Sequence, residues 1–285
     1  MERYGLVLEG GGLRGAYTAG ALAWLNDHNI EFDYAAGISS GAVYLACYEM
    51  KNKDVPYLMA TRYACAKENV GIIPLLREHH YVAYEKIFRD DLIGKAGLDT
   101  KPLLELKPDM EIGAYDLNKG ETIWYGPETV GRDMTLLRAA CALPIASARV
   151  PFDGTILLDG GITKMIPIER AIEKKCTKFL VITTKGADYV RKPSSKMVLF
   201  MMRIFYHEYP KLREDYAVRQ ENYYKQMGII NDLVEKGDAI LMRPTQNIKS
   251  SRYKGEPENM EKLYALGYQD MEDRKEELLT FLGRK

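Results

Sequence analysis

Short apolar runs that end in glycine alternate with longer apolar stretches in the first fifty residues. Residues 6–8 form one such run, and residues 16–25 follow as a helix-like stretch with apolar residues on most faces. The pattern repeats, with a strand predicted at 32–36 and a helix at 42–50. This succession of strand, turn and covered helix is typical of a parallel sheet with helices on its faces.

The rest of the chain continues this pattern less regularly. Between residues 51 and 131, helical segments alternate with proline and glycine. Further strands are predicted at 110–115, 121–125, 156–158, 178–184 and 239–243, and a helix at 136–142. We expect one α/β domain over residues 1–256 and an amphipathic helical extension, residues 257–285, packed on that domain. Gly267 is expected to split the extension into two helices.

Composition narrows the function classes. The 285 residues include 40 basic and 40 acidic side chains, so no overall field favours nucleic acid as a partner. The four cysteines (Cys47, Cys65, Cys141 and Cys176) lack the spacing of a zinc site and are expected to be buried thiols. The N-terminus does not resemble a secretory signal, and no apolar run is long enough to span a bilayer. A cytoplasmic location is expected, with at most peripheral membrane contact.

A candidate nucleophile lies between the second predicted strand and the second predicted helix. Residues 37–41, Gly-Ile-Ser-Ser-Gly, match the pattern G-x-S-x-G. A sharp strand-to-helix turn leaves little room beside the serine, and Gly37 and Gly41 relieve that crowding. We therefore expect the Ser39 hydroxyl to project from the carboxyl end of the strand, near the positive end of the following helix.

A glycine-rich turn follows the first predicted strand. Residues 10–15, Gly-Gly-Gly-Leu-Arg-Gly, allow successive backbone N–H groups to face one anion. In an ester hydrolase that anion is the oxygen of the tetrahedral intermediate. The same residues fit G-x-G-x-x-G, with Glu31 and Asp33 about twenty residues further on, so a dinucleotide-binding oxidoreductase is an alternative. Arg14 is either a surface charge or a brace for this turn that also attracts an anionic group.

Asp159 is the candidate base for Ser39. It ends the predicted strand 156–158, and Gly160 and Gly161 form the turn after it. We expect the carboxylate to emerge at the same sheet edge as Ser39, with burial raising its pKa toward that of a useful base. None of the four histidines (His28, His79, His80 and His207) follows a strand end. A Ser-Asp-His site with His207 is nevertheless kept as an alternative, because its order along the chain is acceptable.

With these three motifs in order, the chain resembles the patatin-like phospholipases, particularly short bacterial members, most strongly over residues 5–185. The resemblance implies a three-layer α/β/α sandwich with a mainly parallel sheet and a Ser–Asp dyad. It places the nucleophile at Ser39, the base at Asp159 and the oxyanion hole at Gly10, Gly11 and Gly12. Supporting positions are Leu13, Arg14, Gly15, Gly37, Gly41, Gly160 and Gly161, and residues 139–144 look like the family's small-residue segment near the active site.

Members of that family cleave acyl esters of lipids without calcium. The resemblance therefore implies a lipid or phospholipid ester as substrate, with no cofactor and no metal. A non-catalytic lipid-binding or regulatory protein on the same scaffold is a further alternative. Residues 197–206 are rich in methionine and phenylalanine and follow a basic loop. A buried helix is the expected structure for this segment, and lining of an acyl pocket or contact with a membrane is the alternative.

Overall fold

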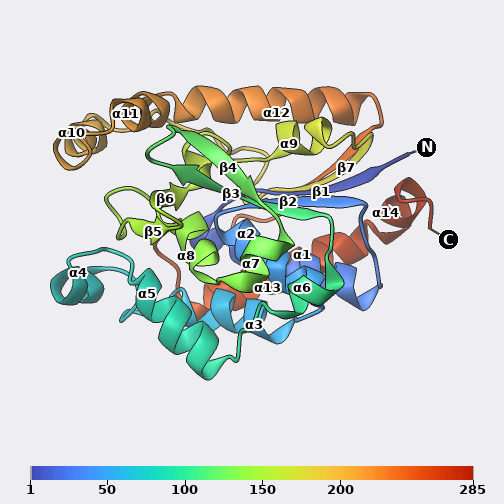
Figure 1. Cartoon of the computed structure of the whole chain (residues 1–285). Helices are drawn as coiled ribbons and strands as arrows, with labels where there is room; N and C mark the ends of the chain where they lie inside the picture. The colour runs from blue at the N-terminus through green and yellow to red at the C-terminus, as the bar shows by residue number, and fades with distance from the viewer. Residues whose placement is uncertain (1, 285) are drawn as a thin grey trace.

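Eight strands form one mixed sheet in the computed structural model, which describes residues 2–284 (Figure 1). The sheet order is β5-β6-β3-β2-β1-β7-β8, and β4 pairs with β3 off this path. The strands are β1 (Tyr4–Leu8), β2 (Tyr34–Ile38), β3 (Met110–Asp116), β4 (Glu121–Tyr125), β5 (Val150–Phe152), β6 (Thr155–Asp159), β7 (Lys178–Ile182) and β8 (Ala239–Met242). Five neighbouring strands of the sheet are parallel: β3, β2, β1, β7 and β8. The other three, β4, β5 and β6, join through antiparallel pairs.

Helices cover both faces of this sheet. Those before β3 are α1 (Ala16–Asp27), α2 (Ser40–Glu49), α3 (Asp54–Leu58), α4 (Ile72–Glu78), α5 (Tyr84–Lys86) and α6 (Pro102–Leu106), with the 3₁₀ turn η1 (Gly12–Gly15) and the π-helical segments η2 (Met59–Tyr63) and η3 (Ile87–Lys95). Those after β4 are α7 (Pro127–Arg132), α8 (Thr135–Cys141), the 3₁₀ turn η4 (Gly160–Ile162), α9 (Ile168–Glu173), α10 (Lys196–Phe205), α11 (Pro210–Ala217), α12 (Arg219–Glu235), α13 (Pro257–Asp273) and α14 (Lys275–Phe281).

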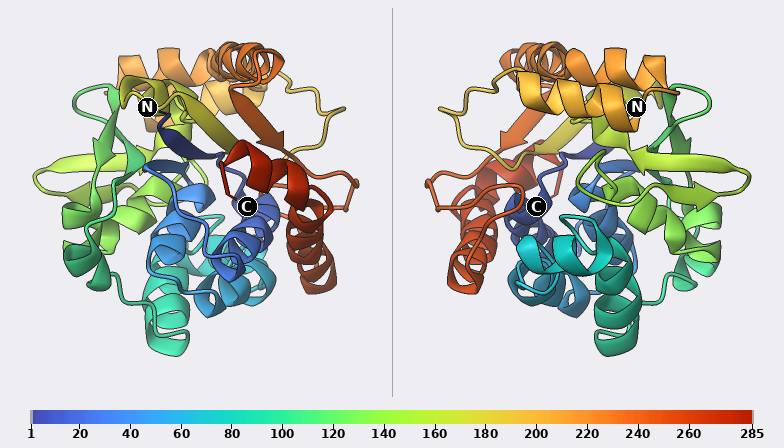
Figure 2. Two further views of the ribbon diagram at one scale, coloured as in Figure 1. Left: turned by 90° about the vertical axis from the view of Figure 1, so that its right-hand side faces the viewer. Right: turned by 90° about the vertical axis from the view of Figure 1, so that its left-hand side faces the viewer.

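The alternation of side chains along the central strands creates two apolar cores. Leu6 and Leu8 face one side of the sheet, where α1, α2 and α8 pack, and Val7 faces the other, under α9 and α12. Figures 1 and 2 show the resulting three layers, with α12 along one face and α1, α2 and α13 along the other. The α/β/α sandwich with a mainly parallel sheet and a helical C-terminal region is therefore confirmed.

Two glycines bring α13 of the predicted extension into direct backbone contact with α1. A Cβ atom on Gly20 would lie 1.9 Å from the carbonyl oxygen of Tyr264, and one on Gly267 would lie 2.0 Å from that of Tyr17. Only glycine permits so close an approach. The prediction that Gly267 splits the extension is wrong: it lies within α13, and the break comes at Arg274.

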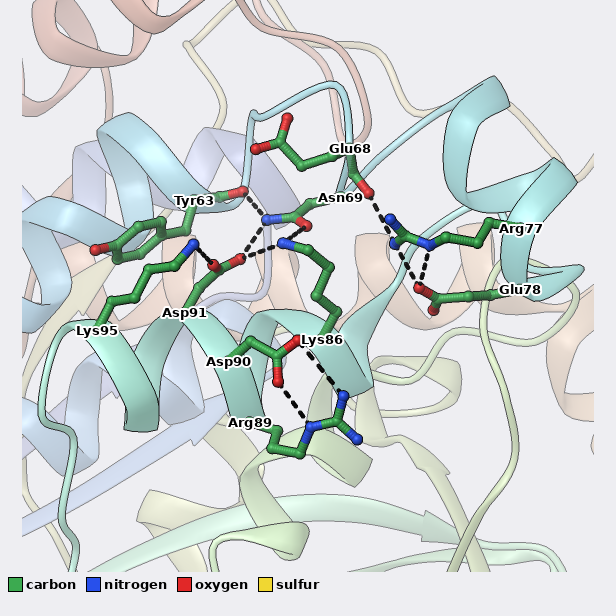
Figure 3. Close-up of polar contacts among 10 residues, drawn as sticks. All are labelled: Tyr63, Glu68, Asn69, Arg77, Glu78, Lys86, Arg89, Asp90, Asp91 and Lys95. Carbon is green, nitrogen blue, oxygen red and sulfur yellow. Dashed lines mark hydrogen bonds and ion pairs between the residues drawn. The ribbon is translucent and has the colours of Figure 1, made fainter.

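The sequence pattern did not predict how the middle of the chain is arranged. In the structure it is mainly helical, and the buried carboxylate of Asp91 connects its parts. The Asp91 side chain accepts hydrogen bonds from Asn69 Nδ2 at 2.7 Å, Lys86 Nζ at 3.1 Å and Lys95 Nζ at 2.6 Å (Figure 3). Burial favours the neutral acid, but these donors hold the pKa of Asp91 below its ordinary value. This network ties η3 to the turn that leads into α4.

Apart from the helix break predicted at Gly267, the local predictions agree with the observed elements, with two exceptions. Each predicted strand occurs, but β5 was not predicted. The expectation of a buried helix at 197–206 is wrong: in α10 only Met202 is buried, and Phe200 is 59% exposed. The four cysteines are buried free thiols, as expected. Among residues 2–284, no helix combines the length and the apolar character needed to cross a membrane.

Candidate active site

Ser39 occupies a strained turn between β2 and α2. Its backbone has φ 56° and ψ −128°, which a residue with a side chain rarely adopts. A Cβ atom on Gly37 would lie 2.7 Å from the Gly41 carbonyl oxygen, and one on Gly41 would lie 2.9 Å from that of Glu9. Both glycines are thus required by space, as the motif predicts. Strain held at a buried serine, which is 7% exposed, is typical of a functional turn.

Two strands bring Ser39 and Asp159 together along one edge of β3. Ile38 of β2 pairs with Gly113, and Asp159 of β6 pairs with the next residue, Ala114. Because β6 runs antiparallel to β3 and β2 runs parallel to it, the carboxyl ends of β2 and β6 meet head to head. Gly113 and Ala114 also pair with β4, which lies along the opposite edge of β3. The strands β2 and β6 therefore lie along the same edge of β3. The meeting depends on the antiparallel direction of β6. The sequence pattern predicted this strand but not its direction.

The Asp159 carboxylate is buried, and Asp159 lines the same cavity as Ser39. Only 2% of the residue is exposed, and its Oδ1 accepts a hydrogen bond from the Gly161 N–H at 2.7 Å. Burial raises the pKa of Asp159 above its ordinary value. Hydrogen bonds from Ser39 and Gly161, and then the charges of two arginines, limit that rise. A carboxylate with a raised pKa is a stronger base.

The three glycines after β1 have different hydrogen-bond partners. The Gly10 N–H donates to the Met165 carbonyl at 3.2 Å, and the Gly11 N–H donates to the Ser40 hydroxyl at 3.1 Å. Within residues 2–284, the Gly12 N–H has no acceptor. Gly12 also has φ +59°, which suits glycine. All three glycines border the cavity in front of Ser39, but in this structure only Gly12 has an uncommitted donor.

A buried ion pair anchors this glycine turn, and the sequence analysis missed it. The Glu9 carboxylate accepts hydrogen bonds from the Thr184 N–H at 2.7 Å and the Thr184 hydroxyl at 2.9 Å, and it also binds Lys185. Burial opposes ionisation of Glu9, but Lys185 and Thr184 hold its pKa below the ordinary value. An acid between an apolar strand and a glycine run was the signal available in the sequence. The pair links the carboxyl ends of β1 and β7 directly beneath the turn.

Cationic side chains surround the cavity in front of Ser39. Four of its lining residues are basic: Lys185, Arg191, Arg219 and Arg252. The Arg252 carbonyl also accepts the Leu13 N–H at 3.2 Å, so the loop before α13 lies directly over the glycine turn. Arg14 is mostly buried and lies against Tyr189, 5.8 Å from its ring centre, so the expectation of a surface charge is wrong. No motif marks Arg191, Arg219 or Arg252 in the sequence.

An apolar groove of about 670 Å³ adjoins the cavity, and Arg252 lines both spaces. One wall comes from α10 and the residues after it, and another from α4 and the loop that follows it. Pro144 and Ile145, which follow the predicted small-residue segment, form part of its floor. Its lining residues include Leu75, Tyr81, Pro144, Ile145, Val198, Met201, Phe205, Tyr206 and Tyr253.

Neither the alternative Ser-Asp-His site nor the alternative dinucleotide site matches this geometry. His207 is exposed after α10, lies 3.4 Å from the Ile204 carbonyl oxygen through Nδ1, and does not line the cavity. Glu31 and Asp33 precede β2, and Asp33 accepts the Tyr4 N–H at the start of β1. They therefore lie at the end of the strands opposite to the glycine turn, where they cannot bind a ribose beside it.

The other histidines have separate surroundings. His28 follows α1 as a C-terminal cap, and its ring stacks on Trp24 with centres 4.0 Å apart. His79 and His80 line the apolar groove. No cluster of three or more potential metal ligands occurs within the part of the chain that the structure describes.

Two parts of the chain match known families of protein domains. Residues 6–172 match the model of the patatin-like phospholipases, and residues 209–283 match a domain of unknown function, DUF6363. An uncharacterized protein of Escherichia coli, YjjU, is 26% identical over 205 residues, which cover 67% of this chain and 54% of YjjU. The chain thus spans about half the length of that relative.

The chain also matches a solved structure, that of VipD from Legionella pneumophila. It is 12% identical, with a TM-score of 0.46, and the alignment covers 99% of this chain and 67% of VipD. The family model alone covers more than half of the chain, from residue 6 to residue 172. The protein therefore belongs to the patatin-like phospholipase family.

Proposed function

We propose that this protein is a serine acyl hydrolase that cleaves lipid esters with Ser39 as nucleophile and Asp159 as base. The observation that carries the proposal is that β2 and β6 end at adjacent positions along β3, so that the buried Ser39 and Asp159 line one cavity. A serine hydroxyl reacts readily only when a neighbour accepts its proton, and Asp159 is the carboxylate placed to do so. The raised pKa of Asp159 favours that transfer.

The reaction proceeds in two halves. In the first, Asp159 takes the hydroxyl proton while the Ser39 oxygen bonds to the acyl carbon, and the protonated Asp159 then delivers that proton to the departing alcohol oxygen. In the second, Asp159 deprotonates water, which attacks the acyl-serine. The bond to the Ser39 oxygen then breaks, that oxygen takes the proton back from Asp159, and the fatty acid is released. The negative oxygen of each tetrahedral intermediate accepts the Gly12 N–H and lies near the amino end of α2, which begins at Ser40.

Labelling with a fluorophosphonate tests this proposal, because the reagent modifies only activated serines efficiently. We expect the intact protein to be labelled at one peptide, the one containing Ser39, and Ser39→Ala to abolish the label. His207→Ala is the matched control and should retain it, since His207 lies outside the cavity. Full labelling of Ser39→Ala, or loss of labelling in His207→Ala with the fold intact, would refute the assignment.

The apolar groove is the proposed site of the acyl chain. Its lining residues on α10 include Met201 and Phe205, flexible or flat apolar side chains that adapt to a hydrocarbon. The two helices that contribute to its walls also carry exposed apolar residues: Ile72, Ile73 and Leu76 on α4, and Met197, Phe200 and Ile204 on α10. Both helices lie at the same end of the molecule in Figure 1. We infer that this end touches the lipid surface during substrate uptake.

A charge placed in the groove should separate long from short substrates. We expect Met201→Glu to lower kcat/KM for monomeric long-chain esters by about 10-fold or more, because an acyl chain then meets an unpaired carboxylate. Esters too short to enter the groove should be hydrolysed at the normal rate. Phe200→Glu is the control on the exposed side of α10, and should act only when the substrate is presented in vesicles. Equal turnover of both chain lengths by Met201→Glu would exclude this groove.

A further inference from the structure

The cavity in front of Ser39 has more positive than negative side chains. Among its lining residues, Lys185 is paired with Glu9, which leaves Arg191, Arg219 and Arg252 opposite a single carboxylate, Asp159. Across residues 2–284, none of these three arginines takes part in an ion pair with Asp or Glu. If Asp159 balances one guanidinium, two positive charges remain without a counter-ion.

Each guanidinium is held by contacts that leave its charge in place. Arg219 Nε donates to the Gly161 carbonyl at 3.0 Å, and the group lies 4.7 Å from the ring centre of Tyr216. Arg191 lies 5.4 Å from the ring centre of Tyr223, and Arg252 lies 5.9 Å from that of Tyr253. Aromatic faces orient a guanidinium without neutralising it. The three guanidinium groups are therefore held in position, and they keep N–H groups that can donate hydrogen bonds to a ligand.

Burial makes this excess of charge costly. Only 8% of Arg191 and 5% of Arg219 are exposed. Burial lowers the pKa of both groups, and repulsion from Arg252 lowers it further. A buried charge without a partner costs several kcal/mol, so a cluster of this kind is stabilised by an anion that enters with the ligand. Phosphate suits the cluster, because its oxygens accept paired bonds from several guanidinium forks at once.

We propose that Arg191, Arg219 and Arg252 bind the phosphate of a glycerophospholipid whose headgroup has a net negative charge. This inference rests on the proposed hydrolase function and names its substrate class. In such lipids the phosphate and the acyl esters are attached to the same glycerol unit, so a phosphate at the arginines leaves an ester near Ser39. Arg252 lies between cavity and groove, so it meets the lipid where headgroup and acyl chain join.

The proposal also assigns a role to the C-terminal region. Arg219 and Arg252 both belong to residues 209–283, the part that matches a domain of unknown function, and they enter a cavity whose nucleophile belongs to the patatin-like part. The C-terminal region thus completes the substrate site. It supplies two of the three arginines that select the headgroup, while the N-terminal part supplies the groups that break the ester.

Matched soluble lipids test this selection without the influence of a membrane surface. For the intact chain, kcat/KM for monomeric dihexanoyl phosphatidate should exceed kcat/KM for dihexanoyl phosphatidylcholine by about 10-fold or more, since choline brings a positive charge to the arginines. Arg191→Gln should lower the ratio of kcat/KM for phosphatidate to that for p-nitrophenyl butyrate by about 10-fold or more. Arg203→Gln, which removes an exposed arginine of α10, should leave that ratio unchanged.

The ratio separates headgroup binding from a general effect on catalysis. If Arg191→Gln slows both substrates equally, the cluster serves only the dyad, and the proposal fails. It also fails if the intact protein prefers phosphatidylcholine. Should Arg191→Gln not fold, Arg191→Lys keeps the charge without the planar fork and should lower the same ratio by a smaller factor.

Binding measured on Ser39→Ala keeps this proposal distinct from the proposed function. We expect dihexanoyl phosphatidate to raise the Tm of that inactive variant, dihexanoyl phosphatidylcholine to raise it less, and the phosphatidate effect to disappear with Arg191→Gln. Inorganic phosphate added alone distinguishes a lipid site from a site for the free anion: an equal rise in Tm contradicts a lipid headgroup site. No rise with phosphatidate refutes the anion site even if fluorophosphonate labels Ser39, and a rise without labelling refutes the hydrolase alone.

Discussion

Asp159→Asn lowers kcat for ester hydrolysis by about 10²–10⁴-fold while Ser39 remains in place. The amide has nearly the shape of the carboxylate, and its oxygen still accepts the Gly161 N–H that now bonds to Oδ1 at 2.7 Å. It cannot, however, take the proton of the Ser39 hydroxyl. The measurement is kcat and KM on a soluble ester, with circular dichroism to show that the fold persists. An Asn variant that keeps more than a tenth of the activity would require another base.

The pH dependence of the intact enzyme follows from the same residue. With Asp159 as the proposed base, its ionised form is the active form, and burial raises its pKa. The acid limb of kcat/KM should therefore lie above the pH range of an ordinary aspartate and disappear in Asp159→Asn. A group whose pKa is raised in the folded state stabilises the fold at low pH, and that contribution is lost as pH rises through the folded pKa. Asp159→Asn should accordingly melt at no lower temperature than the wild type at neutral pH.

Gly267→Ala lowers the free energy of unfolding by about 3–5 kcal/mol, because the added methyl group cannot fit between α1 and α13. Its Cβ would lie 2.0 Å from the Tyr17 carbonyl oxygen, which belongs to the backbone of α1. The helices must separate, and buried residues between them lose contact. Urea denaturation followed by circular dichroism measures the effect. A loss below about 1 kcal/mol would show that the helices are not in direct contact.

Two further glycine variants make this test specific. Gly20→Ala introduces the reciprocal clash, 1.9 Å from the Tyr264 carbonyl oxygen, and the double variant should lose less than the sum of the single losses, because one separation relieves both clashes. Gly228→Ala in α12 is the control. A methyl group there meets nothing within 4 Å, so it should stabilise the protein by about 0.5–1 kcal/mol. These values tie the C-terminal helix, and the Arg252 loop before it, to the stability of the whole domain.

The chemistry-bearing turns were predictable because each depends on local backbone requirements. Ser39 needs flanking glycines, since Gly37 and Gly41 are pressed against backbone atoms within 3 Å of any added Cβ. Asp159 follows a short apolar strand, and burial of that strand carries the carboxylate inside. For both residues, a few neighbours in sequence hold the relevant information. The joint role of Gly10, Gly11 and Gly12 remains a prediction, because two of their N–H groups have other acceptors in this structure.

Other features depend on segments that meet only in the folded chain. The antiparallel arrival of β6 beside β2 is set by pairing with β3, and a short apolar strand has the same pattern in either direction. Glycine has a low helix propensity, so Gly267 by itself predicts a helix break. In the structure the backbone of Tyr17 lies so close that only glycine fits at this position of α13. The exposure of α10 follows from the absence of a covering element over most of its apolar residues, which no local pattern reports.

The sequence by itself determined the strand and helix order, the strained serine turn, the aspartate at a strand end and the family to which they point. Only the tertiary structure decided which strand ends meet, that Glu9 and Lys185 form the base of the glycine turn, and that Arg191, Arg219 and Arg252 gather around Ser39. The physical reason is the range of the interactions. Backbone strain and side-chain periodicity act over a few residues, whereas charge clusters and strand partners are chosen by contacts between segments that lie far apart in the sequence.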